Sequence, residues 1–78
     1  MILVEKFFKV GEARILEWSG VVAIEDAAQI MLNCCNNKST KNGEDPFDVC
    51  LRMINRTLRN GNKMTVAGKL NYYSFQNN

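Results

Sequence analysis

The clearest helical pattern in the chain is DPFDVCLRMINRTLRNG, residues 45–61. Asp45 is a suitable N-cap because its side chain can accept a hydrogen bond from a free backbone N–H of the first turn. Pro46 fits the first helical position, where its missing N–H costs nothing. Gly61 is typical of a left-handed stop after the last turn. These signals predict a helix over residues 46–60, around which the rest of the fold is organised.

This helix has one apolar and one polar side. At about 100° per residue, the apolar side gathers hydrophobic and small side chains and is expected to enter a core. Its members are Phe47, Cys50, Leu51, Ile54, Thr57 and Leu58. The opposite side carries Asp48, Arg52, Asn55, Arg56 and Arg59. Three arginines are therefore expected to face solvent.

A second helix is predicted over residues 23–35, AIEDAAQIMLNCC. Glu25 and Asp26 lie in its first turn, where the helix dipole favours anions. Apolar side chains cover more than half of its circumference, which predicts a mostly buried helix. The residues that follow, 36–44, are all polar or glycine and are expected to form a solvated loop between the two helices.

Residues 2–18 fit two alternative structures. Their β-branched and aromatic side chains favour a β-hairpin that turns at Gly11 and Glu12. The register of that hairpin would set Phe8 opposite Ile15, Phe7 opposite Leu16 and Lys6 opposite Glu17. The same residues wound as a helix would also gather most of the apolar side chains on one side. The hairpin is favoured because a central glycine weakens a helix by about 1 kcal/mol and no capping residue precedes this one.

The C-terminal residues return to strand character. Residues 64–66 and 70–75 are predicted either to pair across Ala67, Gly68 and Lys69 or to form one longer strand bent at Gly68. Both alternatives place the last strand in the same sheet as the N-terminal hairpin.

The order of these elements predicts an α+β fold in a single domain, residues 1–78. An antiparallel sheet of three or four strands, built from the N-terminal hairpin and the C-terminal strand or hairpin, would pack on the two helices. The expected core comprises Phe7 or Phe8, Trp18, Ile30, Leu32, Leu51, Ile54 and Leu58. If residues 2–18 were helical, the result would instead be three helices with a small C-terminal hairpin.

Length and composition are those of one small globular domain, with 78 residues, 46% of them hydrophobic, and a net charge of +2. No apolar run approaches the roughly 20 residues that span a bilayer, and Glu5 and Lys6 interrupt the N-terminal stretch that a signal peptide would need. The three cysteines, Cys34, Cys35 and Cys50, suit a reducing compartment because an odd number does not make a disulfide framework. We therefore expect an intracellular, cytoplasmic protein without a membrane partner.

The composition excludes several kinds of active site. The chain has no histidine, so nucleophiles activated by histidine and histidine zinc sites cannot form within it. Its five glycines are dispersed and make no phosphate-binding loop. Glu44, Asp45 and Asp48 are interpreted as charge at a helix N-terminus, and the cysteines as buried hydrophobic side chains. We expect no catalytic residue, metal or cofactor, and hence no enzyme.

The best candidate binding surface is the arginine side of the second helix. Guanidinium groups suit phosphates or carboxylates, and the cations and aromatic residues that follow could extend such a surface. The candidate partner-binding residues are Arg52, Asn55, Arg56, Arg59, Lys63, Lys69, Tyr72 and Tyr73. The alternative interpretation is a solvated helix face on which Asp48 and Arg52 form an i, i+4 pair.

These features favour a non-enzymatic binding protein that inhibits or regulates a partner protein by occupying a surface on it. A comparison with the small proteins of phages and mobile elements rests on size alone. The alternative is a nucleic-acid-binding regulator that uses the same arginines with the C-terminal aromatic residues, although no ordered nucleic-acid motif supports it. A homodimer is a third option.

Overall fold

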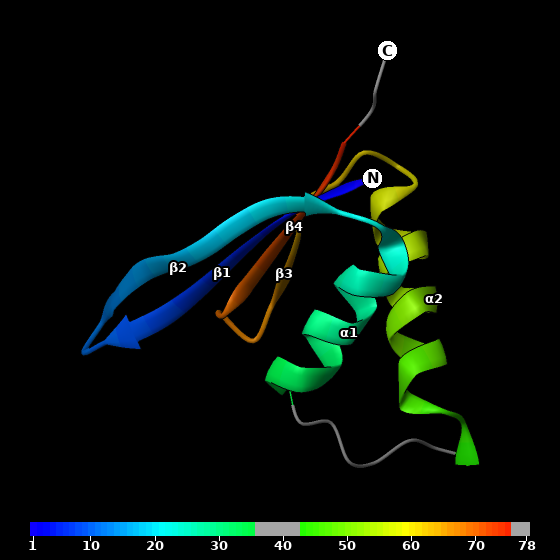
Figure 1. The fold of residues 1–78 in the computed structure, drawn as a ribbon, viewed down its shortest axis with the longest axis horizontal. Coiled ribbons are helices and arrows are strands. Elements are labelled where there is room, and N and C mark those ends of the chain that lie inside the picture. The colour runs from blue at the N-terminus through cyan, green and yellow to red at the C-terminus, as the bar shows by residue number, and fades with distance from the viewer. Residues whose placement is uncertain (36–42, 76–78) are drawn as a thin grey trace.

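A four-stranded sheet with two helices on one of its faces makes up the fold (Figure 1). The computed structural model describes residues 1–35 and 43–75, so most of the expected polar loop, residues 36–42, lies outside the described part. The elements are β1 (Ile2–Val10), β2 (Ala13–Val22), α1 (Ile24–Cys35), α2 (Pro46–Leu58), β3 (Met64–Val66) and β4 (Leu70–Ser74). Neighbouring strands are antiparallel in the order β2-β1-β4-β3, which confirms the predicted α+β architecture.

The N-terminal residues form the hairpin, and the helical alternative is wrong. Phe8 pairs with Ile15 and Phe7 with Leu16, as the sequence predicts. Gly11 has a φ of +61°, a conformation that a glycine adopts without strain at the first central position of a hairpin turn. The turn residue therefore sets the register of the two longest strands.

A bulge changes this register in the middle of the hairpin. Between Lys6 and Phe7 the pairing shifts by one residue, so Lys6 lies opposite Trp18 and not opposite Glu17 as expected. The ion pair survives the shift, since the Lys6 Nζ lies 3.1 Å from a Glu17 carboxylate oxygen. The extra residue is on β2, and beyond it every β2 side chain changes face relative to an unbulged hairpin.

The C-terminal residues form a second hairpin rather than one bent strand. Its turn contains Ala67 and Gly68, both with positive φ, at +51° and +67°. The Lys69 N–H donates to the Val66 carbonyl oxygen at 2.9 Å and closes the turn. β3 and β4 are much shorter than β1 and β2, a difference that decides which part of the first hairpin is covered.

Both helices form close to their predicted limits. α1 begins at Ile24, one residue later than expected, and α2 ends at Leu58, two residues earlier. The Asp45 side chain accepts a hydrogen bond from the Phe47 N–H at 3.2 Å, and Gly61 has a φ of +76° just after the last turn. Neither helix in the described ranges is long and apolar enough to cross a membrane.

The core lies between the helices and the sheet. Its buried members are Ile2, Val4, Ala27, Ala28, Met31, Cys50, Ile54, Leu58, Met64, Leu70 and Tyr72. Ala27 and Ala28 have no exposed surface, because small side chains let α1 approach its neighbours closely. The Tyr72 hydroxyl donates a hydrogen bond to the Ala27 carbonyl oxygen at 3.0 Å. One fully buried side chain thus connects β4 to α1.

The predicted core is partly right. Ile54 and Leu58 are buried, and Ile30, Leu32 and Leu51 pack against the core with part of their surface exposed. Trp18 and Phe8, however, keep 42% and 44% of their surface exposed, and Phe7 is only half-buried. Their burial was expected, but β4 pairs with β1 only over Ile2–Lys6, so the distal half of the first hairpin, which includes Phe8, extends beyond the other two strands (Figure 1). Trp18 lies opposite Lys6 on β2, the edge strand of the sheet.

Replacing Tyr72 with phenylalanine tests the link between β4 and α1. We expect Tyr72→Phe to lower the free energy of unfolding by about 1 to 2 kcal/mol, because it deletes a buried hydrogen bond and keeps the ring. Urea denaturation followed by circular dichroism measures the change. Tyr73→Phe, the same substitution at the half-buried neighbouring residue, should stay within about 0.5 kcal/mol. Equal effects of the two substitutions would contradict the role given to the Tyr72 hydroxyl.

The same hydroxyl predicts a pH dependence. Burial raises the pKa of Tyr72 far above its usual value, and nearby cysteine thiols add to the shift. In the unfolded chain tyrosine ionises near pH 10, so the stability that neutral Tyr72 contributes is complete below pH 10 and is lost as the pH rises further. Between pH 10 and 11.5 the stability of the unmodified protein should therefore fall faster than that of Tyr72→Phe, by up to about 1.4 kcal/mol per pH unit. Parallel pH profiles of the two proteins would contradict this predicted contribution of Tyr72 to stability.

Candidate functional sites

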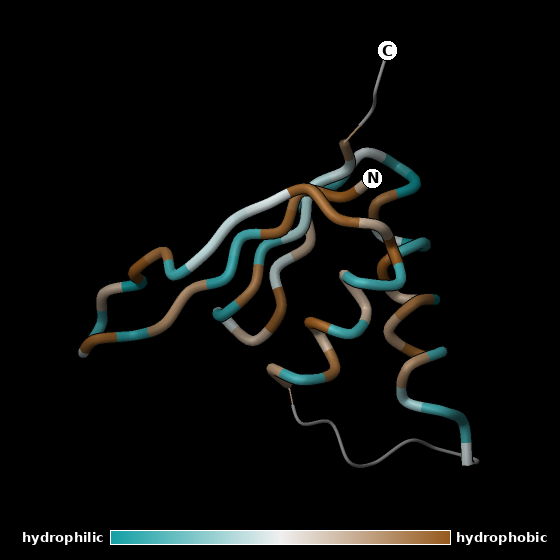
Figure 2. Tube along the Cα trace, in the orientation of Figure 1, coloured by the Kyte–Doolittle hydropathy of each residue, from teal (hydrophilic) through white to brown (hydrophobic). Residues whose placement is uncertain are grey.

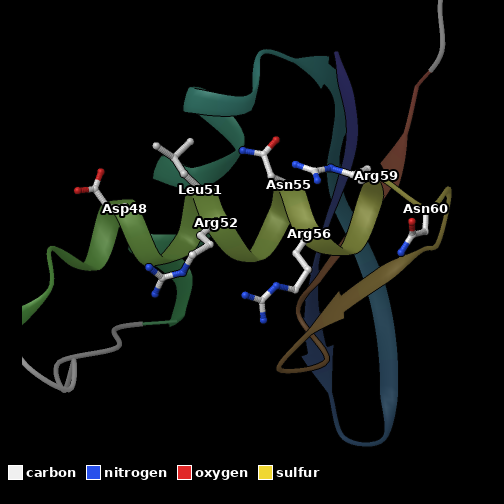
Figure 3. A pocket seen from close by; sticks show the side chains of 7 residues that line it. All are labelled: Asp48, Leu51, Arg52, Asn55, Arg56, Arg59 and Asn60. Carbon is white, nitrogen blue, oxygen red and sulfur yellow. The ribbon is translucent and has the colours of Figure 1, made fainter.

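Four of the predicted binding residues gather on one side of α2. Arg52, Asn55, Arg56 and Arg59 line a shallow groove together with Asp48, Leu51 and Asn60. Figure 3 shows Arg52 and Arg56 extending from the same side of the helix, while the guanidinium of Arg59 turns toward Asn55. All four side chains are exposed. The helix period therefore assembles the arginine surface that the sequence predicted, and we call it the arginine groove.

One arginine of the groove is engaged by a carboxylate. The Arg52 guanidinium lies 2.7 Å from a Glu44 carboxylate oxygen, so Arg52 pairs with Glu44 and not with Asp48 as the i, i+4 interpretation expected. Both side chains of this pair are about half exposed, and exposed pairs contribute at most about 1 kcal/mol to stability. Within the described residues, Arg56 and Arg59 make no ion pair. Their charges are available to an anionic group.

The other four predicted residues do not join the groove. Tyr72 is fully buried in the core, which removes it from any surface. Tyr73, its neighbour, points to the opposite face of the sheet, and the Lys63 Nζ lies 5.8 Å from the centre of its ring. Lys69 is exposed in the turn between β3 and β4. The predicted surface is therefore divided between the outer side of α2 and the sheet.

The sheet face without helices carries a polar network that sequence reasoning missed. Each strand supplies one of its members, Glu5, Arg14, Thr65 and Asn71. The Asn71 amide oxygen accepts from Thr65 at 3.0 Å and from Arg14 at 3.4 Å, and its nitrogen donates to Glu5 at 3.3 Å. Asn71 is 4% exposed, and all of its polar atoms have partners. This network fixes the order of the strands, so a structural role accounts for it.

Arg14 also covers an aromatic ring on that face. Its guanidinium carbon lies 4.1 Å from the centre of the Phe7 ring, a cation–π contact that keeps Phe7 half-buried. Arg14 thus connects the polar network to the hairpin. Arg14 lies opposite Lys9 across the turn, and the register predicted from the sequence already contains this pair.

The largest departure from expectation is an apolar surface on the first hairpin. Phe8, Val10, Ile15, Leu16 and Trp18 are each at least 41% exposed. The first four lie in the half of the hairpin beyond β3 and β4, where Figure 2 shows several hydrophobic segments, and Trp18 lies at the base of that half, opposite Lys6. We call these residues the hairpin patch. Leu16 lies on the sheet face without helices, and the other four lie on the helix side. The signal that could have revealed it is the difference in length between the N-terminal and C-terminal strands. Short C-terminal strands can pair with only part of the long hairpin, so the rest of the hairpin projects into solvent.

Trp18 borders a small cavity, open to solvent, between the first hairpin and α1. The cavity has a volume of about 330 Å³ and is lined by Lys6, Glu17, Trp18, Ile30, Asn33 and Cys34. The lining is mainly apolar, with the Lys6–Glu17 ion pair beside it. The indole lies against the backbone at Gly20, where a β-carbon would be 2.9 Å from the ring. Gly20 therefore lets the indole lie flat along β2.

The cysteines do not form a reactive site in the described structure. Cys50 is buried, and Cys34 and Cys35 are half-buried. Burial raises the pKa of the Cys35 and Cys50 thiols, with a neighbouring cysteine adding to each shift, so the reactive thiolate form is disfavoured. Among the described residues, no three cysteine, aspartate or glutamate side chains come together as metal ligands.

Comparison with protein-family models, with curated proteins and with solved structures finds no match for this chain. Its candidate function therefore has to be argued from the arginine groove, the sheet face and the hairpin patch.

Replacing Gly20 with alanine tests the placement of Trp18. The β-carbon of the alanine would lie 2.9 Å from the indole, which is too close for a van der Waals contact, so the ring has to move away from the backbone. Trp18 is the chain's single tryptophan, which makes its fluorescence specific. We expect Gly20→Ala to shift the emission to longer wavelength and to increase quenching by acrylamide. Ser19→Ala, one residue away, should change neither, and an unchanged spectrum for Gly20→Ala would contradict the placement.

Proposed function

We propose that the chain is a non-enzymatic, cytoplasmic binding protein that inhibits or regulates a partner protein by occupying a surface on it. The hairpin patch carries this proposal. Small proteins of phages and mobile elements often work this way, but that comparison concerns size alone.

The composition of the hairpin patch supports a protein partner. Monomeric proteins rarely leave several large apolar side chains exposed on one element, because their contact with water is unfavourable by about 25 cal/mol per Å². Here the patch includes Phe8 and Trp18, and aromatic side chains are enriched at the centres of protein interfaces. A partner that covers the patch removes this surface from water.

The arginine groove supports the same function in a different way. Arg56 and Arg59 could meet carboxylates on a partner, since a guanidinium forms two parallel hydrogen bonds with a carboxylate. Such charged contacts mainly raise the rate of association, whereas the apolar contacts of the patch supply affinity. The patch is therefore the first place to test.

Two serine substitutions test the patch. Ile15→Ser combined with Leu16→Ser removes apolar surface that is already 41% and 50% exposed, so the fold should remain. The tagged chain is used to capture partners from the cells that produce it, and the affinity for a stoichiometric partner is then measured by calorimetry. We expect the double variant to bind at least about tenfold more weakly, as a loss of about 1.4 kcal/mol implies.

Met53→Ser is the matched control for this test, because Met53 is 43% exposed on α2 outside the patch. Its affinity should match that of the unmodified protein. A partner that binds the double variant normally would contradict the proposed use of the hairpin patch.

A nucleic-acid-binding regulator is the second candidate, and the arginine groove is the observation that favours it. Arg52, Arg56 and Arg59 lie along one helical side, where they could contact successive phosphates. The burial of Tyr72 and the separate position of Tyr73 weaken this candidate, because the bases would lack a stacking surface beside the arginines.

Salt dependence separates this candidate from the first. If the groove binds phosphates, affinity for mixed DNA and RNA oligonucleotides should fall steeply between 50 and 200 mM salt, by about tenfold or more for three contacts. Replacing all three arginines with glutamate should abolish binding while the circular dichroism spectrum stays unchanged. Absence of binding at low salt would remove nucleic acid as a ligand.

A further inference from the structure

The outer edge of β2 is a long strand edge without a partner strand in the described structure. β2 runs over Ala13–Val22 and pairs with β1 on one side only. The opposite edge of the sheet, β3, has three residues and is therefore short enough to resist further pairing. The two edges of the sheet thus differ greatly in the length of backbone that could pair with a further strand.

Hydrogen bonding within the sheet shows which β2 groups point outward. The Phe7 N–H donates to the Lys69 carbonyl oxygen, so Phe7 directs its backbone groups toward the β4 side. Because these groups alternate along a strand, Lys6 directs its own toward β2, where it pairs with Trp18. Ser19, the next residue, then directs both its N–H and its C=O away from the sheet. These two backbone groups could therefore form hydrogen bonds with another strand.

The sequence of β2 does little to prevent such pairing. Protected edges carry lysine or proline, and ARILEWSGVV contains neither. The bulge opposite Lys6 and the charged Arg14 and Glu17 are protective features, but the strand continues on both sides of the bulge. Ile15 and Leu16 are exposed on opposite faces of the strand, so an added strand would cover apolar surface on both.

The cavity beside Trp18 defines one side chain of the occupant. A strand added along β2 would place alternate side chains on the helix side of the sheet, the side on which Trp18, Ile30 and Cys34 line the cavity. Its volume of about 330 Å³ is ample for a branched aliphatic side chain. The occupant is therefore an extended segment with an apolar residue at that position.

The charge around β2 defines the remaining side chains. Residues 12–26 carry four acidic side chains, Glu12, Glu17, Glu25 and Asp26, against the single basic Arg14, which gives 1 − 4 = −3. Lys6 and Lys9 of β1, which pair with Trp18 and Arg14, reduce this to −3 + 2 = −1. Lys6 neutralises Glu17, but the other three carboxylates are exposed without an ion pair in the described residues. Two copies of β2 joined by a twofold axis would bring these like charges together, which disfavours a second copy. Basic residues in the partner segment would complement them.

We propose that β2 binds an extended segment of the partner protein, apolar and basic in alternation, as a fifth strand of the sheet, with one aliphatic side chain in the cavity beside Trp18. This proposal rests on the proposed function and specifies the chemistry of the partner. The backbone of β2 would add to the affinity that the hairpin patch supplies, and the cavity would supply selectivity, as in other cases of strand addition.

A synthetic octapeptide in which lysine and isoleucine alternate serves as the probe. Titrated into the full chain, it should shift Trp18 emission to shorter wavelength in a saturable way, because the indole becomes covered. A peptide of alternating glutamate and isoleucine should bind at least about tenfold more weakly, the equivalent of about 1.4 kcal/mol. Equal affinity of the two peptides would overturn the charge part of the proposal, and no saturable binding of the lysine peptide would overturn it entirely.

Two changes test strand pairing itself. Ser19→Pro deletes an outward N–H without removing a hydrogen bond to β1, and it should weaken the lysine peptide by about tenfold, whereas Ser19→Ala should not. In case Ser19→Pro fails to fold, a lysine peptide N-methylated at three consecutive residues makes the same test on the unmodified protein, because it cannot pair through either edge. Undiminished binding of the methylated peptide would overturn strand addition.

Sedimentation of the unmodified chain tests whether a second copy of the chain, and not a partner segment, occupies β2. A monomer is expected, and a dimer that Ser19→Pro dissociates would show that a second copy occupies β2 and would overturn the proposal. The proposed function has its own test in the Ile15→Ser and Leu16→Ser variant. Partner binding that needs the hairpin patch but is unaffected by Ser19→Pro would reject strand addition and leave the proposed function in place.

Discussion

β4 pairs with β1 only over Ile2–Lys6, and the exposure of the distal half of the first hairpin depends on that limit. Over Val4–Lys6 the sheet is four strands wide, and it holds the buried side chains of Val4 and Tyr72 against the helices. Beyond Lys6 only β1 and β2 continue, as a two-stranded ribbon. An isolated ribbon is marginally stable in water, so burying its apolar side chains against a partner would stabilise it.

The helices are placed by a few contacts that connect them firmly to the wide part of the sheet. The Tyr72 hydroxyl bonds to the Ala27 carbonyl oxygen, and the two alanines of α1 have no exposed surface. On the other face, Asn71 binds side chains from all three other strands. Consecutive residues of β4 therefore organise opposite faces of the sheet, one by packing and the other by hydrogen bonds.

Local signals in the sequence predict the elements well, because caps and turns act over a few residues. Asp45 caps α2, Gly11 turns the first hairpin, and the helix period gathers the arginines into one groove. The burial of Trp18 was predicted wrongly, because it depends on the edge position of β2 in the sheet and on how far α1 covers that edge, which are relations between residues remote in sequence. Tyr72 and Tyr73 show the same limit, since adjacent tyrosines look alike until the strand assigns them to opposite faces.

The bulge at Glu17 decides what kind of surface the hairpin presents. Without it, the register set at Gly11 would place Trp18 opposite Glu5, on the sheet face that carries the polar network. The extra residue moves Trp18 opposite Lys6, on the helix side, where it meets Ile30 and Cys34 and borders a cavity. Glu17 still reaches Lys6, so the shift costs no ion pair. One inserted residue thus turns an aromatic side chain from a polar face into the wall of an apolar site, and it does so on the strand whose outer edge is free to pair.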